Sequence, residues 1–228
     1  MALNNAPIAT IIGRNTRSTV DENDRLWLLR SVEAEGQPRE LVAQTLVNRW
    51  AFLRDSGFAR EYPTLASFIR AYSSPMDPRF TTSGHLTAQK LRDATSTADK
   101  QKIATEAARN TDFQRRMTFS DDTKAAVQRA LFEGPKDLPA GVIHFAANYV
   151  TPLGKQVLVI LGDDDHNAFY RTDSSVGYLY SVAPIQVQQA NIASLAIVGG
   201  LLYFGYKSWR RRERKAGNIT FRDVDDEQ

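Results

Sequence analysis

Apolar residues recur three or four positions apart in several stretches of the chain, which is the period of an amphipathic helix. Thr19 and Glu22 have the spacing of a capping box, so we expect a first helix that starts near Val20 and ends near Gly36. Pro38 suits the first turn of a second helix, which should run to about Asp55. The two helices would meet at a tight turn.

The same period predicts three further helices, over residues 64–71, 86–108 and 121–132. A loop is expected at 73–78, where two prolines interrupt the pattern. The best strand candidate is the apolar run 156–161, which three consecutive aspartates follow closely. The sequence therefore predicts a mainly α (α+β) domain with a small β element.

The C-terminal part has a different pattern, because residues 174–206 contain no Asp, Glu, Lys or Arg. A helix over 187–206 would be about 30 Å long, the thickness of the hydrocarbon layer of a membrane. Trp209 and a run of Lys and Arg follow at once, as expected at a lipid–water interface. We therefore predict one transmembrane helix over 187–206, with a buried core helix as the alternative.

These patterns divide the chain into five parts. They are a flexible N-terminal segment (1–20), a globular domain (21–173), a linker (174–186), the transmembrane helix (187–206) and a basic then acidic tail (207–228). The positive-inside rule places the tail in the cytoplasm and the domain on the periplasmic or outer face, as a single-pass membrane protein. The N-terminal segment lacks the pattern of a secretory signal, so a membrane-associated place in a virion is the other prediction.

Composition excludes several kinds of site. The 228 residues include no cysteine and three histidines, too few ligands for a zinc finger or an iron–sulfur centre. His144 and His166 could share a metal with a carboxylate, but Asp163 to Asp165 fit a turn better, so we predict no metal and no cofactor. The basic run beside the apolar segment favours anionic lipid over nucleic acid as its partner.

One carboxylate lies in an unusual place. Leu26 and Leu29 form the apolar stripe of the first helix, and Glu33 continues that stripe at helical spacing. Burial disfavours the charged form of a carboxyl group and raises its pKa, which would make Glu33 a usable general acid. The alternative is a structural carboxylate paired with Arg30 or Arg49.

Three motifs resemble the spore-cortex-lytic family of bacterial cell-wall hydrolases. The first is Arg30-Ser-Val-Glu-Ala-Glu-Gly-Gln-Pro38 with the helix Leu41-Val-Ala-Gln-Thr-Leu-Val-Asn-Arg49. The second runs from Tyr62-Pro-Thr to Arg79-Phe-Thr81, and the third combines Gly141-Val-Ile-His-Phe145 with His166-Asn-Ala-Phe-Tyr170. They occur in the family's order, and residues 84–120 match it least.

The resemblance implies a lysozyme-like fold and cleavage of the MurNAc–GlcNAc bond of peptidoglycan by a lytic transglycosylase that uses one glutamate. The residue that matches this glutamate is Glu33. The expected product has a 1,6-anhydromuramoyl end, and no second carboxylate is needed. Gln37 departs from the family, in which an acidic residue is common at this place. Glu35 lies on another helix face, so we expect it to be exposed to solvent or to make a local hydrogen bond.

Other residues are expected to support the site. His144, Asn148 and Tyr149 lie in a segment analogous to those that line the cleft of lysozyme-like enzymes, where they would hold a sugar ring. An alternative is that Phe145 and Tyr149, four positions apart, belong to the core. Asn48 and Arg49 are expected to pin the second helix to the turn that follows Glu33, with glycan contact as the alternative.

The leading hypothesis is a membrane-anchored enzyme that opens peptidoglycan locally, for phage infection or for an envelope-spanning machine. Its partners would be glycan strands, the lipid membrane through residues 187–206, and proteins of the virion or the machine. The alternative is a non-catalytic bitopic scaffold protein that uses the same domain to bind glycan.

Overall fold

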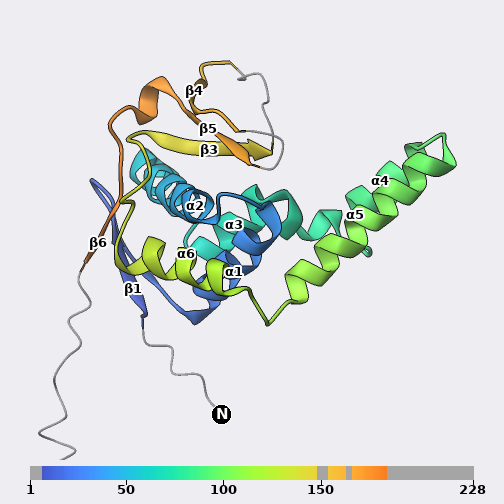
Figure 1. Ribbon diagram of the computed structural model, residues 1–228, viewed down its shortest axis with the longest axis horizontal. Helices are drawn as coiled ribbons and strands as arrows, with labels where there is room; N and C mark the ends of the chain where they lie inside the picture. The colour runs from blue at the N-terminus through green and yellow to red at the C-terminus, as the bar shows by residue number, and fades with distance from the viewer. Residues whose placement is uncertain (1–6, 148–153, 163–165, 184–228) are drawn as a thin grey trace, which may run out of the picture. The chain divides into compact units, whose positions relative to one another are not determined.

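The structure, a computed structural model, describes residues 7–147, 154–162 and 166–183. Within these residues the fold is mixed α+β, with helices in the majority and two small sheets (Figure 1). This confirms the predicted class. The predicted transmembrane segment 187–206 lies outside the described residues. Within them, the structure contains no helix with the length and apolar character that crossing a membrane requires.

Six α-helices account for most of the described part of the domain. Their bounds are α1 Glu22–Glu35, α2 Arg39–Leu53, α3 Leu65–Tyr72, α4 His85–Asp93, α5 Thr97–Arg115 and α6 Asp121–Phe132. Short helical turns cover Arg54–Phe58, Ser74–Met76, Pro78–Phe80 and Asp173–Ser175. The helices predicted near 38–55, 64–71 and 121–132 are confirmed as α2, α3 and α6.

The start of α1 differs from the prediction. Its N-cap is Asp21, whose side chain accepts a hydrogen bond from the amide of Asp24 and completes a capping box with it. Thr19 instead lies in a strand, paired with Thr10. The prediction was wrong by two residues because Thr19 and Asp21 both begin a capping-box pattern, and strand pairing decides between them.

The N-terminal residues form a sheet. β1 (Ala9–Ile12) lies between β2 (Arg17–Val20) and β6 (Ser181–Ala183), and both pairings are antiparallel. Residues 9–20 are therefore not a flexible segment, and the predicted linker 174–186 contains a strand of the domain. The predicted domain limits 21–173 are therefore too narrow. The sequence could not show this, because pairing between the two ends of the domain is not visible in any local pattern.

A second antiparallel sheet has the order β3–β5–β4, with β3 Val142–Ala147, β4 Val157–Ile160 and β5 Asn167–Arg171. β4 confirms the predicted strand. The central β5 is buried along most of its length. β3 packs against α2, so this sheet covers one side of the helical core (Figure 1).

Helix α2 lies at the centre of the core. Trp50 is fully buried there, and its indole nitrogen donates a hydrogen bond to the carbonyl of Tyr62 at 3.1 Å. Asn48 is also fully buried; its amide donates to the carbonyl of Val142 at 2.8 Å and accepts from the amide of Tyr180 at 3.0 Å. Asn48 therefore ties α2 to β3 and to the segment that precedes β6.

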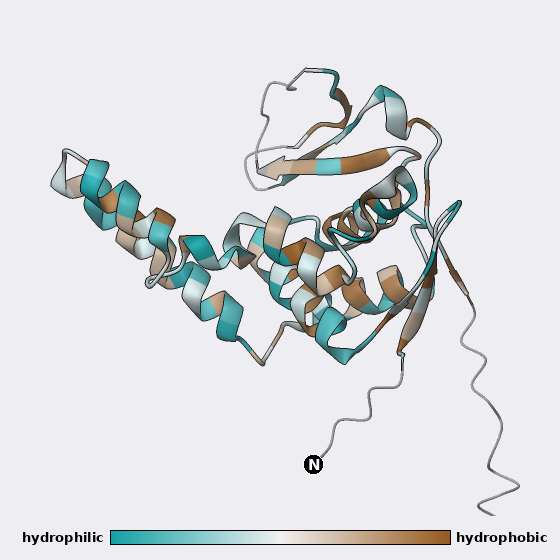
Figure 2. Cartoon of the chain, turned by 180° about the vertical axis from the view of Figure 1, so that it is seen from behind, coloured by the Kyte–Doolittle hydropathy of each residue, from teal (hydrophilic) through white to brown (hydrophobic). Residues whose placement is uncertain are grey.

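Residues 86–108, predicted as one helix, form two. The break precedes Thr97, where Ser96 caps α5 by accepting from the amide of Asp99 at 3.0 Å. Helices α4 and α5 lie side by side and extend away from the other helices (Figure 1). Their residues are mostly hydrophilic, whereas apolar residues concentrate in the core helices and strands (Figure 2). The local Ser-x-x-Asp cap outweighs the continuous helical period.

Candidate functional site

The site is built around the C-terminal end of α1. Gly36 ends the helix with a φ of 86°, a backbone conformation that favours glycine. Asn167 at the start of β5 then holds this end: its side-chain amide donates to the carbonyls of Glu35 at 2.9 Å and Gln37 at 3.1 Å. The sheet thereby fixes the position of the last helical turn, which carries both Glu33 and Glu35.

Glu33 serves as an anchor for α6. Its Oε2 accepts hydrogen bonds from the amide of Ser120 at 3.3 Å, from the Ser120 hydroxyl at 2.9 Å and from the Thr123 hydroxyl at 2.6 Å. Arg116 lies 3.7 Å from Oε1. Burial alone would raise the pKa of Glu33, but the hydrogen bonds from Thr123 and Ser120 outweigh it, so this pKa is lowered.

These contacts correct the sequence interpretation of Glu33 in two respects. Its pKa shifts in the direction opposite to the expected one, because the apolar stripe of α1 ends beside the polar N-terminus of α6 rather than in an apolar pocket. The basic residue that pairs with it is Arg116, and not Arg30 or Arg49. Glu33 therefore remains ionised at neutral pH.

Glu35 has the environment expected of a general acid. The hydroxyl of the buried Ser73 donates to Oε1 of Glu35 at 2.6 Å, and Ser31 in turn donates to Ser73 at 3.0 Å. Within the described residues, Oε2 has no hydrogen-bond partner. Burial raises the pKa of Glu35 more than the Ser73 hydrogen bond lowers it. The expectation of an exposed or locally bonded side chain was wrong.

Glu35 lines a cavity of about 170 Å³ between α1, α2, α3 and β3. The other polar residues in its wall are Thr45, Arg49 and Ser74. The apolar part of the wall consists of Leu46, Phe68, Tyr72, Ile143, Phe145 and Ala146. The cavity therefore combines one carboxyl group, one cation, hydroxyl groups and aromatic rings, the mixture of groups that can hold a sugar ring.

Arg49 and Thr45 lie one helical turn apart on α2 and both reach this cavity. The guanidinium of Arg49 lies 4.0 Å from the centre of the Tyr72 ring. The Thr45 hydroxyl is buried and has no hydrogen-bond partner among the residues that the structure describes. Of the residues predicted to pin α2 to the turn after Glu33, Arg49 instead faces the cavity and Asn48 binds other segments.

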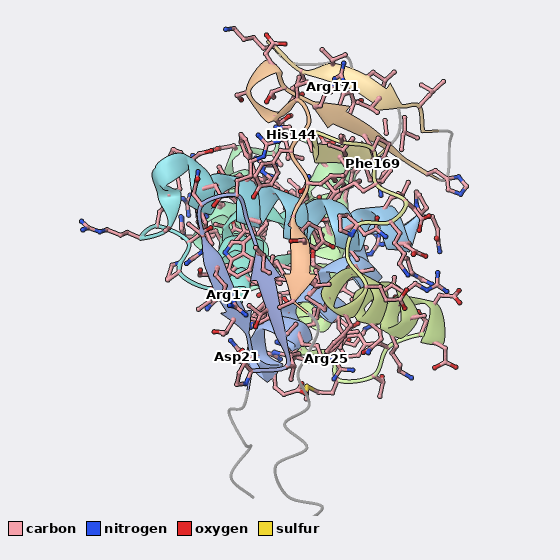
Figure 3. The ribbon with its side chains drawn as sticks, turned by 90° about the vertical axis from the view of Figure 1, so that its left-hand side faces the viewer. Arg17, Asp21, Arg25, His144, Phe169 and Arg171 are labelled. Carbon is pink, nitrogen blue, oxygen red and sulfur yellow. The ribbon has the colours of Figure 1, made fainter. Side chains whose placement is uncertain are left out.

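His144 lies on β3, where the sheet meets the helices beneath it (Figure 3). It is half-buried, and burial together with the charge of Arg49 lowers its pKa to about 4. His144 is thus a neutral neighbour of Arg49, and the cavity is lined by the residues on either side of it. The other two predicted sugar contacts, Asn148 and Tyr149, lie outside the described residues.

Gln37, which replaces the family's acidic residue, lies outside the cavity. Its backbone carbonyl accepts from the amide of Asn167 at 2.7 Å, and its side chain accepts from the amide of Arg39 at 3.3 Å. In the part of the chain that the structure describes, no three His, Cys, Asp or Glu side chains form a metal-binding group. Comparison of the chain with protein-family models, with curated proteins and with solved structures finds no match.

Sequence reasoning missed Ser73, Thr45 and Asn167. Ser73 was part of a predicted loop, and Asn167 was part of a quoted motif without an assigned role. The spacing of Thr45 and Arg49 on one helix face was a readable signal. This spacing alone does not indicate a cavity, because the opposite wall comes from α3 and β3, which are distant in the sequence.

Proposed function

We propose that this protein cleaves the glycosidic bonds of peptidoglycan strands, with Glu35 as the single general acid and base. The observation that carries this proposal is the position of Glu35, half-buried in the wall of a cavity, with one carboxyl oxygen that no described residue engages. The substrate class rests on the resemblance of three ordered motifs to cell-wall hydrolases, and this resemblance also supports a lysozyme-like fold.

The chemistry follows from the two oxygens of Glu35. Because Ser73 donates to Oε1, the proton of the neutral acid resides on Oε2. Oε2 gives this proton to the glycosidic oxygen as the bond to the anomeric carbon breaks. The resulting carboxylate then removes a proton from the 6-hydroxyl of muramic acid, whose oxygen attacks the anomeric carbon and forms the 1,6-anhydro ring. If water replaces the 6-hydroxyl, the product is a reducing end.

The choice of Glu35 departs from the motif, which matches Glu33 to the family's glutamate. Glu33 has a lowered pKa, and its Oε2 already accepts three hydrogen bonds, so it is a poor proton donor. Glu35 is two residues further along, in the same last turn of α1. Both assignments thus place the catalytic carboxyl group in the last turn of α1, and they differ in the residue that carries it.

We further propose that residues 187–206 anchor the enzyme in a membrane and hold the domain against the wall. The apolar composition of this segment and the basic run after it support this. Anchoring would confine cleavage to one place, as phage infection or an envelope-spanning machine requires.

The test is incubation of purified peptidoglycan with the full chain in detergent micelles, followed by mass spectrometry of the soluble fragments. Anhydromuramoyl ends are expected, and reducing ends would indicate hydrolysis by the same acid. The matched control is Glu35→Gln, which keeps the shape of the side chain and removes the acid. Binding to peptidoglycan without released fragments would refute the enzyme and support the non-catalytic scaffold.

A further inference from the structure

Beside Glu35, the cavity contains a cation, Arg49, that forms no ion pair with any residue of the described part of the chain. Arg49 is half-buried, and within the described residues no carboxylate lies at ion-pair distance from its guanidinium. Its contact is the Tyr72 ring, 4.0 Å away. Tyr72 thereby stabilises the charged guanidinium, and of its five N–H donors those that do not face Tyr72 remain available to a ligand in the cavity.

A second polar group in the same wall lacks a partner. Thr45 is 1% exposed, and its Oγ1 forms no hydrogen bond within the described structure. Buried hydroxyl groups are normally hydrogen-bonded, because losing water without a replacement is unfavourable. Since Thr45 and Arg49 are one turn apart on α2, an acceptor bound in the cavity can take a hydrogen bond from each.

From this pair we propose that Arg49 and Thr45 form a subsite for a carboxylate carried by the saccharide next to Glu35. This rests on the proposed function, within which the carboxylate is the lactyl group of muramic acid. The planar guanidinium can bind both carboxylate oxygens, and the Thr45 hydroxyl can donate to one of them. The preferred substrate is then a glycan strand whose lactyl carboxylates are free.

A carboxylate bound at this subsite would also favour cleavage of the glycosidic bond. Positive charge develops at the anomeric carbon as the glycosidic bond breaks, so an unpaired Arg49 nearby opposes that step. A bound lactyl carboxylate neutralises Arg49. In intact peptidoglycan this carboxyl group is joined to the stem peptide by an amide bond, so an amidase reaction that removes the peptide must supply the substrate.

The test compares the binding of three ligands that the protein does not cleave. Each ligand is added to the full chain in detergent micelles, and its binding is measured by ligand-observed NMR. N-acetylmuramic acid and N-acetylglucosamine differ only in the lactyl ether, and in the primary amide of N-acetylmuramic acid the lactyl carboxyl is replaced by a neutral group, so this ligand carries no carboxylate. We expect N-acetylmuramic acid to bind about tenfold more tightly than either of the others. Equal binding of all three by the unmodified protein overturns the proposal without any mutation.

Variants then test the residues. Arg49→Met should remove the preference for N-acetylmuramic acid, and Thr45→Val should reduce it about threefold. The matched control is Arg70→Met, because Arg70 also lies over an aromatic ring, 5.1 Å from the centre of Trp27, but outside the cavity. A preference that survives in Arg49→Met overturns the proposal.

Glu35→Gln separates this subsite from the catalytic proposal. It should abolish cleavage of peptidoglycan and keep the preference for N-acetylmuramic acid. If this variant still cleaves peptidoglycan, Glu35 is not the general acid. The ligand comparison then still tests whether Arg49 binds a carboxylate. If the preference disappears with Glu35→Gln and survives in Arg49→Met, the carboxylate subsite is wrong.

Discussion

Replacing Glu33 by Ala should destabilise the domain, because this carboxylate anchors the N-terminal turn of α6. Its Oε2 accepts hydrogen bonds at 3.3, 2.9 and 2.6 Å, and its side chain is 12% exposed. A hydrogen bond to a charged group contributes about 1.5–3 kcal/mol, and bonds that share one acceptor do not add fully. The Thr123 hydroxyl, which is fully buried, would lose its charged acceptor. We therefore expect a loss of about 3 kcal/mol in the free energy of unfolding.

The destabilisation should depend on pH in a defined direction. The pKa of Glu33 is lowered in the folded state, so its contribution is complete above its unfolded pKa of about 4.3 and is lost as pH falls through the folded pKa. Chemical denaturation of the wild type and Glu33→Ala at pH 7 should thus show the full difference, which shrinks at pH 3.

A matched control is Glu106→Ala, which removes an exposed carboxylate from α5 and should change stability by less than about 0.5 kcal/mol. A loss below about 0.5 kcal/mol at pH 7 for Glu33→Ala, or a loss that is the same at both pH values, would refute the anchoring role.

Three further predictions concern single contacts. Asn48→Ala should lower the free energy of unfolding by about 3 kcal/mol in denaturant titrations, because it leaves two buried backbone groups without partners; a loss under about 1 kcal/mol contradicts this. His144 should titrate by NMR near pH 4, and stability should fall as pH drops below about 6.5, since only the unfolded state binds the proton there; a midpoint near 6.5 contradicts burial beside Arg49. Ser73→Ala should move the alkaline limb of the cleavage rate to higher pH, because the hydrogen bond from Ser73 lowers the pKa of Glu35; an unmoved limb contradicts that contact.

The sequence predicts those elements whose signals are local. Helices α3 and α6 have clear caps at Thr64 and Ser120 and an apolar face, so pattern and structure agree. The N-terminal sheet could not be predicted, because β1 pairs with β6 from the other end of the domain, and β6 is only Ser181–Ala183. Such short strands form through their partners and not through their own periodicity.

The sequence and the structure both direct attention to the last turn of α1, but they favour different residues there, Glu33 from the sequence pattern and Glu35 from the cavity that it lines. Glu33 continues the stripe of Leu26 and Leu29, and this periodicity suggested burial in an apolar pocket. Its surroundings are decided by Ser120 and Thr123, which are 87 and 90 residues away in the chain. A helical pattern shows which face a residue occupies and is silent about what packs against that face.

The central claim is that Glu35, and not Glu33, donates the proton. Its most direct test is the initial rate of release of soluble fragments from purified peptidoglycan by wild type, Glu35→Gln and Glu33→Gln, at a temperature at which circular dichroism shows all three folded. Removing a general acid lowers the rate by about 10²–10⁴-fold, so Glu35→Gln should lose activity to that extent while Glu33→Gln stays within about tenfold of wild type. The reverse order, with Glu33→Gln inactive and Glu35→Gln active, would contradict the account.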